Sequence, residues 1–441
     1  MPIDGNSPGA EGAKRTVGTF NRRRFLKATS AGALAAGAGC IGGTGGDGGD
    51  GGNGDGITLG ALVALPGDFA GGTAHQEAAE LAVQQINDDG GILDQEVDLI
   101  VKDTQLDPAT ARSRYRELVI DEQVDATFGL FGSEEGLAVA EEIPEHGTLH
   151  IFAGVADTGI NDQIRNDYDQ SKYMFRAMYN GVHYGRNLAD VMDAKWEDWG
   201  FERIGVAVED IEGFTNTIKP TALDNAPDFV EVAFDQSFSV DTTDFAPILD
   251  QAEDEDIDML FAFVSQAGVG LTAEWAQRRP DFHYGGADVH AGEPAQWENT
   301  DGVIEGVWSY VGGGAPGVEP TERTGEMIAA HEEMHGHVPE HAQGYTMYDA
   351  VMAWKEAVEI AESIDSDELV PVLEQDVEFE ATTGTLSFQE QDAEFPHDPV
   401  FGDDGVRPPI MQWQEVDGEG TQVGLWPDSV KAGELQDPPW F

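Results

Sequence analysis

The chain has a single cysteine, Cys40, among its 441 residues. One thiol cannot form a disulfide within the chain, so the fold must depend on its apolar core instead of cross-links. Long hydrophobic runs are missing as well, because the longest ones, such as residues 259–264, have only the length of a β-strand. These two absences exclude a disulfide-stapled scaffold and predict no transmembrane helix after residue 40.

Basic residues are scarce. Lys and Arg number 23 against 84 Asp and Glu, which gives a formal net charge of −61. Nucleic acid is therefore excluded as a partner, since binding to phosphates requires Lys and Arg. In about 1 M salt the Debye length falls to about 3 Å and most of the self-repulsion is screened, so we expect a halophilic surface. A disordered acidic chain is excluded because 40% of the residues are hydrophobic and recur with regular periods.

Several catalytic and cofactor motifs are also missing. The sequence contains no P-loop, no G-x-S-x-G elbow and no dinucleotide fingerprint at a strand–helix junction. It thus lacks a phosphate cradle for ATP hydrolysis and a nucleophile motif for acyl transfer. We expect no cofactor, and ATP would be used by a partner.

The chain begins with an ordered series: Arg22 and Arg23, a short run of Ala, Gly and Leu, and then Cys40 after small residues. This series resembles a twin-arginine export signal that ends in a lipid-attachment cysteine. The alternative, a basic amphipathic helix, does not account for the order. We predict a signal over residues 1–40, a lipid anchor at Cys40 and a flexible Gly/Asp-rich tether over residues 41–56. The protein would then be extracellular, held at the outer face of the cytoplasmic membrane.

From residue 57 onward, short apolar segments alternate with amphipathic ones, which is the pattern of an α/β fold with parallel sheets. The roughly 385 residues after the tether exceed one typical core, so we expect two lobes. The expected strands are residues 57–65, 97–101, 124–128, 149–152, 204–208, 229–234, 257–263 and 282–287. The expected helices are residues 74–87, 108–120, 133–143, 216–225, 244–252, 267–278 and 322–335.

Several motifs within this pattern are typical of one protein family: Pro66-Gly67 after the first strand, Asp89-Gly90-Gly91-Ile92, Phe128-Gly129 with Ser133, Val208-Glu209-Asp210 and YTMYDAVMAW at residues 345–354. Through them, residues 57–388 resemble the type I periplasmic binding proteins of ABC importers for branched-chain amino acids and amides. The resemblance implies two Rossmann-like lobes with parallel sheets, joined by a three-crossover hinge and closing on a ligand. Lobe 1 would comprise residues 57–177 and 310–383, and lobe 2 residues 178–309 and 384–441.

The resemblance also implies which residues hold the ligand. Gly132 and Ser133 open a predicted helix, so the Ser133 hydroxyl and nearby backbone N–H groups would bind a ligand carboxylate. Alternatively, Ser133 only caps the helix, since serine is a preferred N-cap. Asp288 stands where amino-acid binders place the carboxylate that pairs with the ligand ammonium. The alternative for Asp288 is an isolated surface aspartate in an acidic chain.

Three further pocket positions depart from the amino-acid-binding pattern. Ala156 stands where threonine is usual, Phe214 replaces a tyrosine, and Ser265 lies near a position that often carries an aromatic ring. Two hydroxyl groups are thus missing, and we expect a roomier, less polar pocket. An amino acid, branched-chain or other, is the first expected ligand class. A short amide, a urea-like compound or a small carboxylate follows.

One motif points to chemistry instead of binding. HEEMH, from His331 to His335, matches H-E-x-x-H, and His341 follows at the third-ligand spacing of metzincin proteases. On a helix, His331 and His335 share a face, so they would bind Zn²⁺ while Glu332 activates water. These three histidines are the candidate metal ligands.

The stretch after this motif argues against a protease. Val338 and Pro339 resist the turn that would bring a third ligand back to the helix. We therefore expect a receptor and not an enzyme: it captures a small solute and delivers it to ABC permease and ATPase subunits. Two alternatives stay open, a zinc metalloprotease and a sensory solute receptor of the same fold.

Overall fold

The computed structural model describes residues 56–441 apart from residues 67–68, 266 and 311. All the described residues belong to one unit, residues 55–441. None of its helices combines the length and the apolar composition that crossing a bilayer requires. Arg22, Arg23, the lipidation site Cys40 and nearly all of the predicted tether lie outside the described residues.

The first sheet has five parallel strands in the order β2-β1-β3-β4-β5. Strands β3 and β4 are entirely buried, whereas the edge strand β2 is mostly half-buried. Continuous apolar runs of this kind are typical of a parallel sheet with helices on both faces. The bounds are Ile57–Val63 (β1), Val97–Asp103 (β2), Ala126–Gly129 (β3), Leu149–Phe152 (β4) and Met174–Arg176 (β5).

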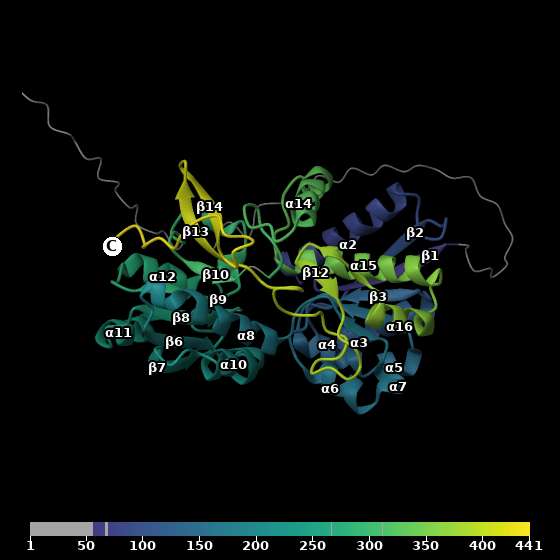
Figure 1. The fold of residues 1–441 in the computed structure, drawn as a ribbon, viewed down its shortest axis with the longest axis horizontal. Helices are drawn as coiled ribbons and strands as arrows, with labels where there is room; N and C mark the ends of the chain where they lie inside the picture. The colour runs from purple at the N-terminus through teal and green to yellow at the C-terminus, as the bar shows by residue number, and fades with distance from the viewer. Residues whose placement is uncertain (1–55, 67–68, 266, 311) are drawn as a thin grey trace, which may run out of the picture. The chain divides into compact units, whose positions relative to one another are not determined.

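Two layers of helices cover this sheet (Figure 1). Leu59 and Ala61 of β1 pack into the core that contains α2 and α15, while Leu62 packs against α3 in a second cluster. Adjacent residues of a strand point to opposite faces, so the two helix layers lie on opposite sides. The bounds are Ala70–Asp88 (α2), Pro108–Arg116 (α3), Glu117–Asp121 (η2), Ser133–Ala140 (α4), Ile143–His146 (α5), Gly159–Asn166 (α6), Tyr168–Ser171 (α7), Glu322–His335 (α14), Gln343–Ala361 (α15) and Ser366–Gln375 (α16).

The second sheet has seven strands in the order β14-β13-β10-β9-β8-β6-β7. The strands from β7 to β10 pair in parallel, and β13 pairs antiparallel with both β10 and β14. The strand bounds are Arg203–Glu209 (β6), Glu231–Phe238 (β7), Met259–Val264 (β8), His283–Asp288 (β9), Trp308–Tyr310 (β10), Ile410–Val416 (β13) and Glu419–Trp426 (β14).

Shorter helices accompany the second sheet. They are Gly181–Val191 (α8), Met192–Trp196 (η3), Glu197–Trp199 (α9), Phe214–Ile218 (η4), Lys219–Asp224 (α10), Ala246–Asp254 (α11), Gly270–Arg278 (α12), His290–Gly292 (η5) and Gln296–Asn299 (α13). Glu378–Ala381 (β11) and Gly384–Ser387 (β12) form a separate antiparallel pair.

Local sequence signals explain where several elements begin and turn. The Asp107 side chain accepts a hydrogen bond from Thr110 N at 2.8 Å, and Pro108 occupies the first turn of α3, where a missing N–H costs nothing. Between β13 and β14, Asp417 and Gly418 have φ angles of 54° and 92°. Two consecutive left-handed residues make the tight turn that an Asp-Gly pair favours in a hairpin.

The predicted alternation is confirmed: each expected strand and helix of residues 57–335 overlaps an element of its type, and the α/β class with parallel sheets is correct. The hairpin β13–β14 was not predicted, and it adds an antiparallel edge to the second sheet. The chain passes between the two sheets three times, after β5, after β10 and after β12. The predicted lobe boundaries stay a prediction.

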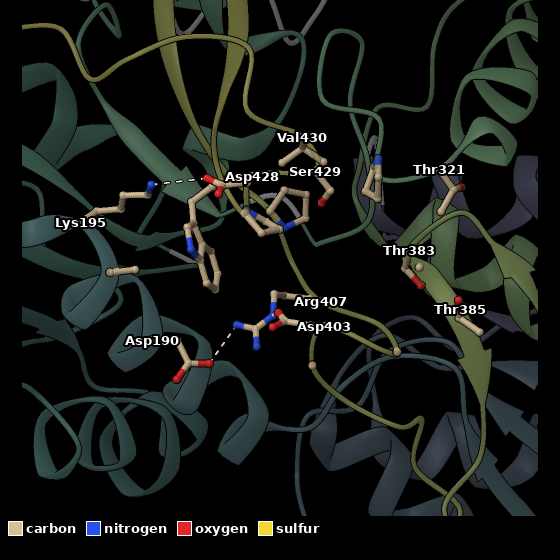
Figure 2. A pocket seen from close by; sticks show the side chains of 18 of the residues that line it. Asp190, Lys195, Thr321, Thr383, Thr385, Asp403, Arg407, Asp428, Ser429 and Val430 are labelled. Carbon is tan, nitrogen blue, oxygen red and sulfur yellow. Dashed lines mark hydrogen bonds and ion pairs between the residues drawn. The ribbon is translucent and has the colours of Figure 1, made fainter.

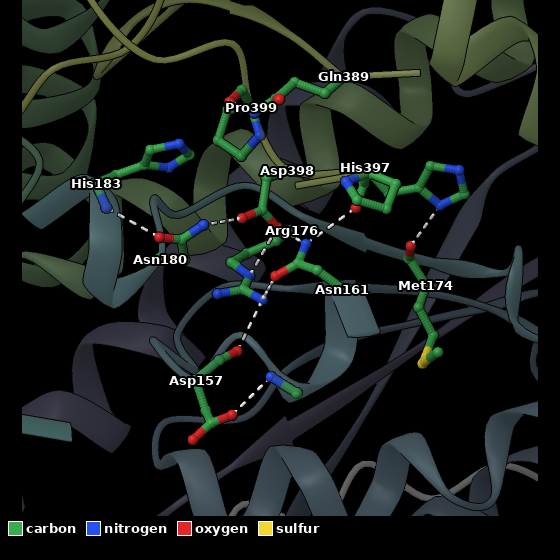
Figure 3. Close-up of polar contacts among 12 residues, drawn as sticks. Asp157, Asn161, Met174, Arg176, Asn180, His183, Gln389, His397, Asp398 and Pro399 are labelled. Carbon is green, nitrogen blue, oxygen red and sulfur yellow. Dashed lines mark hydrogen bonds and ion pairs between the residues drawn. The ribbon is translucent and has the colours of Figure 1, made fainter. Parts of the chain in front are cut away.

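A buried ion pair lies at the first of these passages (Figure 3). Arg176, the last residue of β5, is 3.1 Å from Asp398 (Nε to Oδ1), and both side chains are only 1% exposed. Asn161 and Asn180 each donate a side-chain N–H to Asp398, at 2.9 Å and 2.7 Å. One aspartate of the third passage thus joins β5, α6 and the start of α8.

Candidate functional site

The carboxyl ends of the parallel strands carry the residues that the sequence marked for ligand binding. Gly132 and Ser133 follow β3, Ala156 follows β4, Ser265 follows β8, and Asp288 ends β9. In open α/β sheets, ligands bind outside these ends of the strands.

Ser133 is the first residue of α4, and Gly132 is its N-cap. The Ser133 hydroxyl accepts a hydrogen bond from Asp157 N at 3.2 Å, which joins the loop after β4 to the start of α4. A hydroxyl that accepts from the backbone still has its own proton to donate. Ser133 can therefore offer a donor at a helix N-terminus, the arrangement that suits an anion.

Ala156 and Phe214 have structural partners. Ala156 is half-buried, and its carbonyl oxygen accepts from Gly181 N at 2.7 Å, at the start of α8. Phe214 is buried, with its ring centroid 6.1 Å from that of Phe263. Neither side chain supplies a polar group, which agrees with the two missing hydroxyls.

Ser265 lies directly after β8, where its backbone N–H donates to Glu209 at 2.6 Å. Glu209 is itself completely buried at the end of β6. This bond joins the ends of two neighbouring strands, so Ser265 is placed by its backbone, and no hydrogen bond of its hydroxyl occurs among the described residues.

The Asp288 carboxylate is buried and already accepts three hydrogen bonds. Thr272 and Tyr284 donate to Oδ2 at 3.0 Å and 2.8 Å, and Ala291 N donates to Oδ1 at 3.2 Å. Burial raises the pKa of Asp288, against the opposing influence of His290. Asp288 is thus not the isolated surface aspartate of the alternative interpretation, because its carboxylate holds the loop after β9.

The sequence interpretation missed a group of rings near the start of α4 and α15. Phe131 lies 4.7 Å from Phe69, 6.0 Å from His75 and 5.3 Å from His341, measured between ring centroids. His75 is fully buried in α2, and neither of its ring nitrogens has a hydrogen-bond partner among the described residues. Burial and the nearby His341 lower the pKa of His75 to about 3, so this ring is neutral. His75 is thus a buried, neutral imidazole packed against Phe131, two residues before the start of α4.

A second missed group follows β9. His290 Nδ1 lies 3.2 Å from Glu293, and Gln296 donates to the same carboxylate at 2.6 Å. Burial lowers the pKa of His290, but Glu293 and Asp288 outweigh it and raise the pKa to about 9. His290 is therefore charged at neutral pH. The charges of Glu293 and His290 also act on His341. Burial lowers the pKa of His341 to about 4, although the Glu293 carboxylate opposes this shift.

Gly72, near the start of α2, allows this helix to approach the end of β1 closely. A Cβ atom there would lie 1.5 Å from the Ala64 carbonyl oxygen, so α2 approaches the end of β1 too closely for any side chain. Glycine is therefore required at this position.

A separate hollow of about 820 Å³ lies at a different place, lined by α8, η3 and the passages after β10 and β12 (Figure 2). Both of its cations already pair: Arg407 with Asp190 at 2.8 Å and Lys195 with Asp428 at 3.6 Å. Because the parallel strands do not end in this hollow, we favour the carboxyl ends as the site.

The predicted metal ligands do not lie together. His331 and His335 share one face of α14, with ring centroids 4.7 Å apart. His341 lies instead against Phe131, and its Nδ1 accepts from Gln343 N at 3.1 Å. Its assignment as third ligand is wrong, because the chain leaves α14 through Gly336 (φ 85°) and carries His341 to the start of α15. Glu332, the expected base, is exposed.

The two sheets, the three passages between them and the polar groups at the carboxyl ends define the class of two-lobed α/β binding proteins. A family model described as periplasmic binding protein matches residues 56–402. The chain belongs to the periplasmic binding protein family.

Solved structures show the same fold at low sequence identity. An ABC transporter structure from Silicibacter pomeroyi has a TM-score of 0.75 and 18% identity over 88% of this chain and 100% of that chain. The substrate-binding protein LivJ from Streptococcus pneumoniae, in complex with isoleucine, has a TM-score of 0.68 and 19% identity (84% and 100%). A solute-binding protein from Rhodopseudomonas palustris, in complex with 3,4-dihydroxybenzoic acid, has a TM-score of 0.68 and 18% identity (87% and 99%). The fold is thereby the type I periplasmic binding protein fold.

A curated relative matches over a shorter stretch. The chemotactic signal transduction system substrate-binding protein BasB of Halobacterium salinarum is 31% identical over 140 residues, which are 31% of this chain and 33% of BasB. The chain thus matches only about a third of that relative's length.

Proposed function

We propose that this chain is the solute receptor of an ABC importer and that its ligand carries a carboxylate. The observation that supports this most is the start of α4, where Ser133 keeps a hydroxyl proton to donate beside the positive end of the helix. The ligand would be held between lobes of residues 57–177 with 310–383 and 178–309 with 384–441. Closure about the three passages would present the loaded form to a permease. The reaction is binding, with no bond made or broken.

Two ligand classes fit this proposal, small aromatic carboxylates and amino acids. The side chains at the strand ends favour the first. Phe69, Phe131 and His341 supply ring surfaces for an aromatic body, as in a benzoate. An amino acid needs an anionic partner for its ammonium, and Asp288 already accepts three hydrogen bonds. Structural neighbours bind isoleucine and 3,4-dihydroxybenzoic acid, so both classes occur on this fold. We place small aromatic carboxylates first and branched-chain amino acids second.

The test is a calorimetric titration of the protein with 3,4-dihydroxybenzoate, isoleucine, isoleucine amide and urea in molar KCl. Binding of one carboxylate, without binding of its amide, supports the proposal. Replacing Ser133 by Ala should weaken binding by about 1 to 3 kcal/mol if the hydroxyl is a buried ligand contact. The matched control is Ser237→Ala, an exposed serine on β7 that should not change affinity. Equal affinity of Ser133→Ala and wild type would refute the assignment.

Export and anchoring belong to the same proposal. Arg22 and Arg23 would direct the chain through a translocase, and lipid at Cys40 would hold it at the outer face of the membrane. A Cys40→Ser variant should move from the membrane fraction to the medium. Recovery of that variant in the membrane fraction would contradict a lipid anchor.

A sensory receptor is the second candidate, because the match to BasB, a chemotactic substrate-binding protein, is 31% identical over 140 residues. The two candidates differ in their partner and not in their ligand. Deleting the gene would abolish uptake of the ligand if the chain serves an importer, and would abolish movement toward the ligand with uptake intact if it serves a sensor.

A further inference from the structure

Four side chains meet where α14 crosses α2, away from the strand ends. Glu77 comes from α2, His331 and His335 from α14, and His337 from the turn after α14. The Glu77 carboxylate lies 3.4 Å from His331 Nε2, 3.4 Å from His337 Nε2 and 4.0 Å from His335 Nδ1. Three imidazoles thus surround one carboxylate.

The outer nitrogen of each imidazole faces a backbone carbonyl oxygen. The distances are 2.8 Å from His331 Nδ1 to His337 O, 3.2 Å from His335 Nε2 to Glu77 O, and 3.0 Å from His337 Nδ1 to Val338 O. A nitrogen beside a carbonyl must carry the proton, which leaves a lone pair on the inner nitrogen of a neutral ring. This is the outer bonding that orients histidine ligands in metal sites.

Two of the inner atoms lack a hydrogen-bond partner among the described residues. His331 is fully buried, and neither its Nε2 nor Glu77 Oε2 has a hydrogen-bond partner among the described residues. A cation between His331 Nε2 and Glu77 Oε2 would give both buried atoms a partner.

The distances fit one metal in particular. Zn²⁺ binds nitrogen and carboxylate oxygen at about 2.0 to 2.2 Å in a tetrahedron, whose ligands are then about 3.3 to 3.5 Å apart. Each Glu77 oxygen makes one contact of this length, Oε2 with His331 and Oε1 with His337, and one ligand atom from each of the three residues lies within 4.8 Å of the others. We propose that Glu77, His331 and His337 bind one Zn²⁺ ion.

The role of this site is structural. It would fasten α14 to α2, the helix that also carries His75. Hydrolysis of a substrate would need an open coordination position and a base, and the base of the sequence motif, Glu332, is exposed.

A second cluster in the described chain offers a matched control. Glu142, Glu145 and His146 also place three ligand atoms within 4.8 Å. Glu142, however, already pairs with Arg116 at 2.6 Å and Arg112 at 3.5 Å, so its charge is neutralised by two guanidinium groups. We expect no metal there.

The experiment uses the full chain, stripped with EDTA and titrated with ZnCl₂ in molar KCl, with bound zinc measured by mass spectrometry after dialysis. We expect one Zn²⁺ per chain. Glu77→Gln, His331→Ala and His337→Ala should each weaken binding by at least on the order of 100-fold, since even outer-shell changes cost about 10- to 100-fold. His146→Ala should bind zinc as the wild type does. His337 is 39% exposed, so His337→Ala leaves the core intact and separates metal loss from unfolding.

Co²⁺ provides a second readout, because a tetrahedral site gives it visible absorption that an octahedral aquo ion lacks. Wild type should show these bands and His337→Ala should not. Zinc at less than half an ion per chain, binding only at millimolar concentration, or undiminished binding in Glu77→Gln and His337→Ala would overturn the proposal. Equal loss in His146→Ala would overturn it as well.

Discussion

Replacing Asp398 by Asn should be among the most destabilising single changes in this chain. Asp398 and Arg176 form a pair in which both side chains are 1% exposed. The two oxygens of Asp398 accept from amide groups, Oδ1 from Asn161 and Oδ2 from Asn180. An asparagine would turn one of its own N–H donors toward one of these donors and would leave the guanidinium without its anion.

The magnitude follows from what remains around Arg176. Its Nη2 donates to Asp157 O at 3.0 Å and Asn161 Oδ1 at 3.1 Å, which are both neutral. A guanidinium cannot escape its charge by losing a proton. Removing one partner of a buried pair costs about 3 to 5 kcal/mol, a large part of a typical stability of about 5 to 15 kcal/mol.

Removing the cation should cost less. In Arg176→Met the carboxylate keeps both amide donors, and burial already raises the pKa of Asp398, so a proton can neutralise it. The variant with both Asp398→Asn and Arg176→Met should then have nearly the same free energy of unfolding as Arg176→Met alone, because the two changes remove one shared interaction. Urea unfolding of the four proteins at constant salt measures this cycle. An Asp398→Asn midpoint equal to that of wild type, or strictly additive changes, would refute the reasoning.

Two further predictions concern stability. Burial raises the pKa of Asp349 to about 6 even though Thr382 and Thr383 donate to it, so its stabilising effect is complete below pH 3.8 and is lost as the pH rises through 6. The free energy of unfolding of Asp349→Asn, relative to that of wild type, should therefore rise by about 2 to 3 kcal/mol between pH 4 and pH 7. Unfolding titrations at several pH values measure this difference, and a difference that does not vary with pH would contradict the prediction. Gly72→Ala should cost about 3 kcal/mol or more, because its Cβ would overlap the Ala64 carbonyl, whereas Gly213→Ala, whose Cβ meets nothing within 4 Å, should melt near the wild-type temperature.

The strands and helices could be predicted because each has a recognisable pattern within its own segment of sequence. β8 is six apolar residues in a row, and α14 has a capping Thr321 before it and Gly336 after it. The hairpin β13–β14 has a comparable signal, the Asp417-Gly418 turn, but a hairpin falls outside the alternation of strands and helices on which the prediction rests.

The site was accessible to prediction only in part. Ser133 was found because it follows a strand and opens a helix, which is a local property. His75 and His341 come together from α2 and the start of α15, some 266 residues apart in the sequence, and no spacing rule connects them. The same limit applies to the histidines of the motif: Glu77 and His337 lie beside His331 in space, whereas the motif pointed to His341.

Among the four edge strands of the two sheets, β2 and β7 carry several charged residues. β2 carries Asp98, Lys102 and Asp103, and β7 carries Glu231 and Asp235. In strong brine the repulsion between whole molecules is screened and no longer keeps them apart. Docking a foreign strand on either edge would still strip water from these groups, a cost that dissolved ions do not remove. Charged residues on these edges should therefore disfavour strand-to-strand association even at high salt, where long-range repulsion is screened.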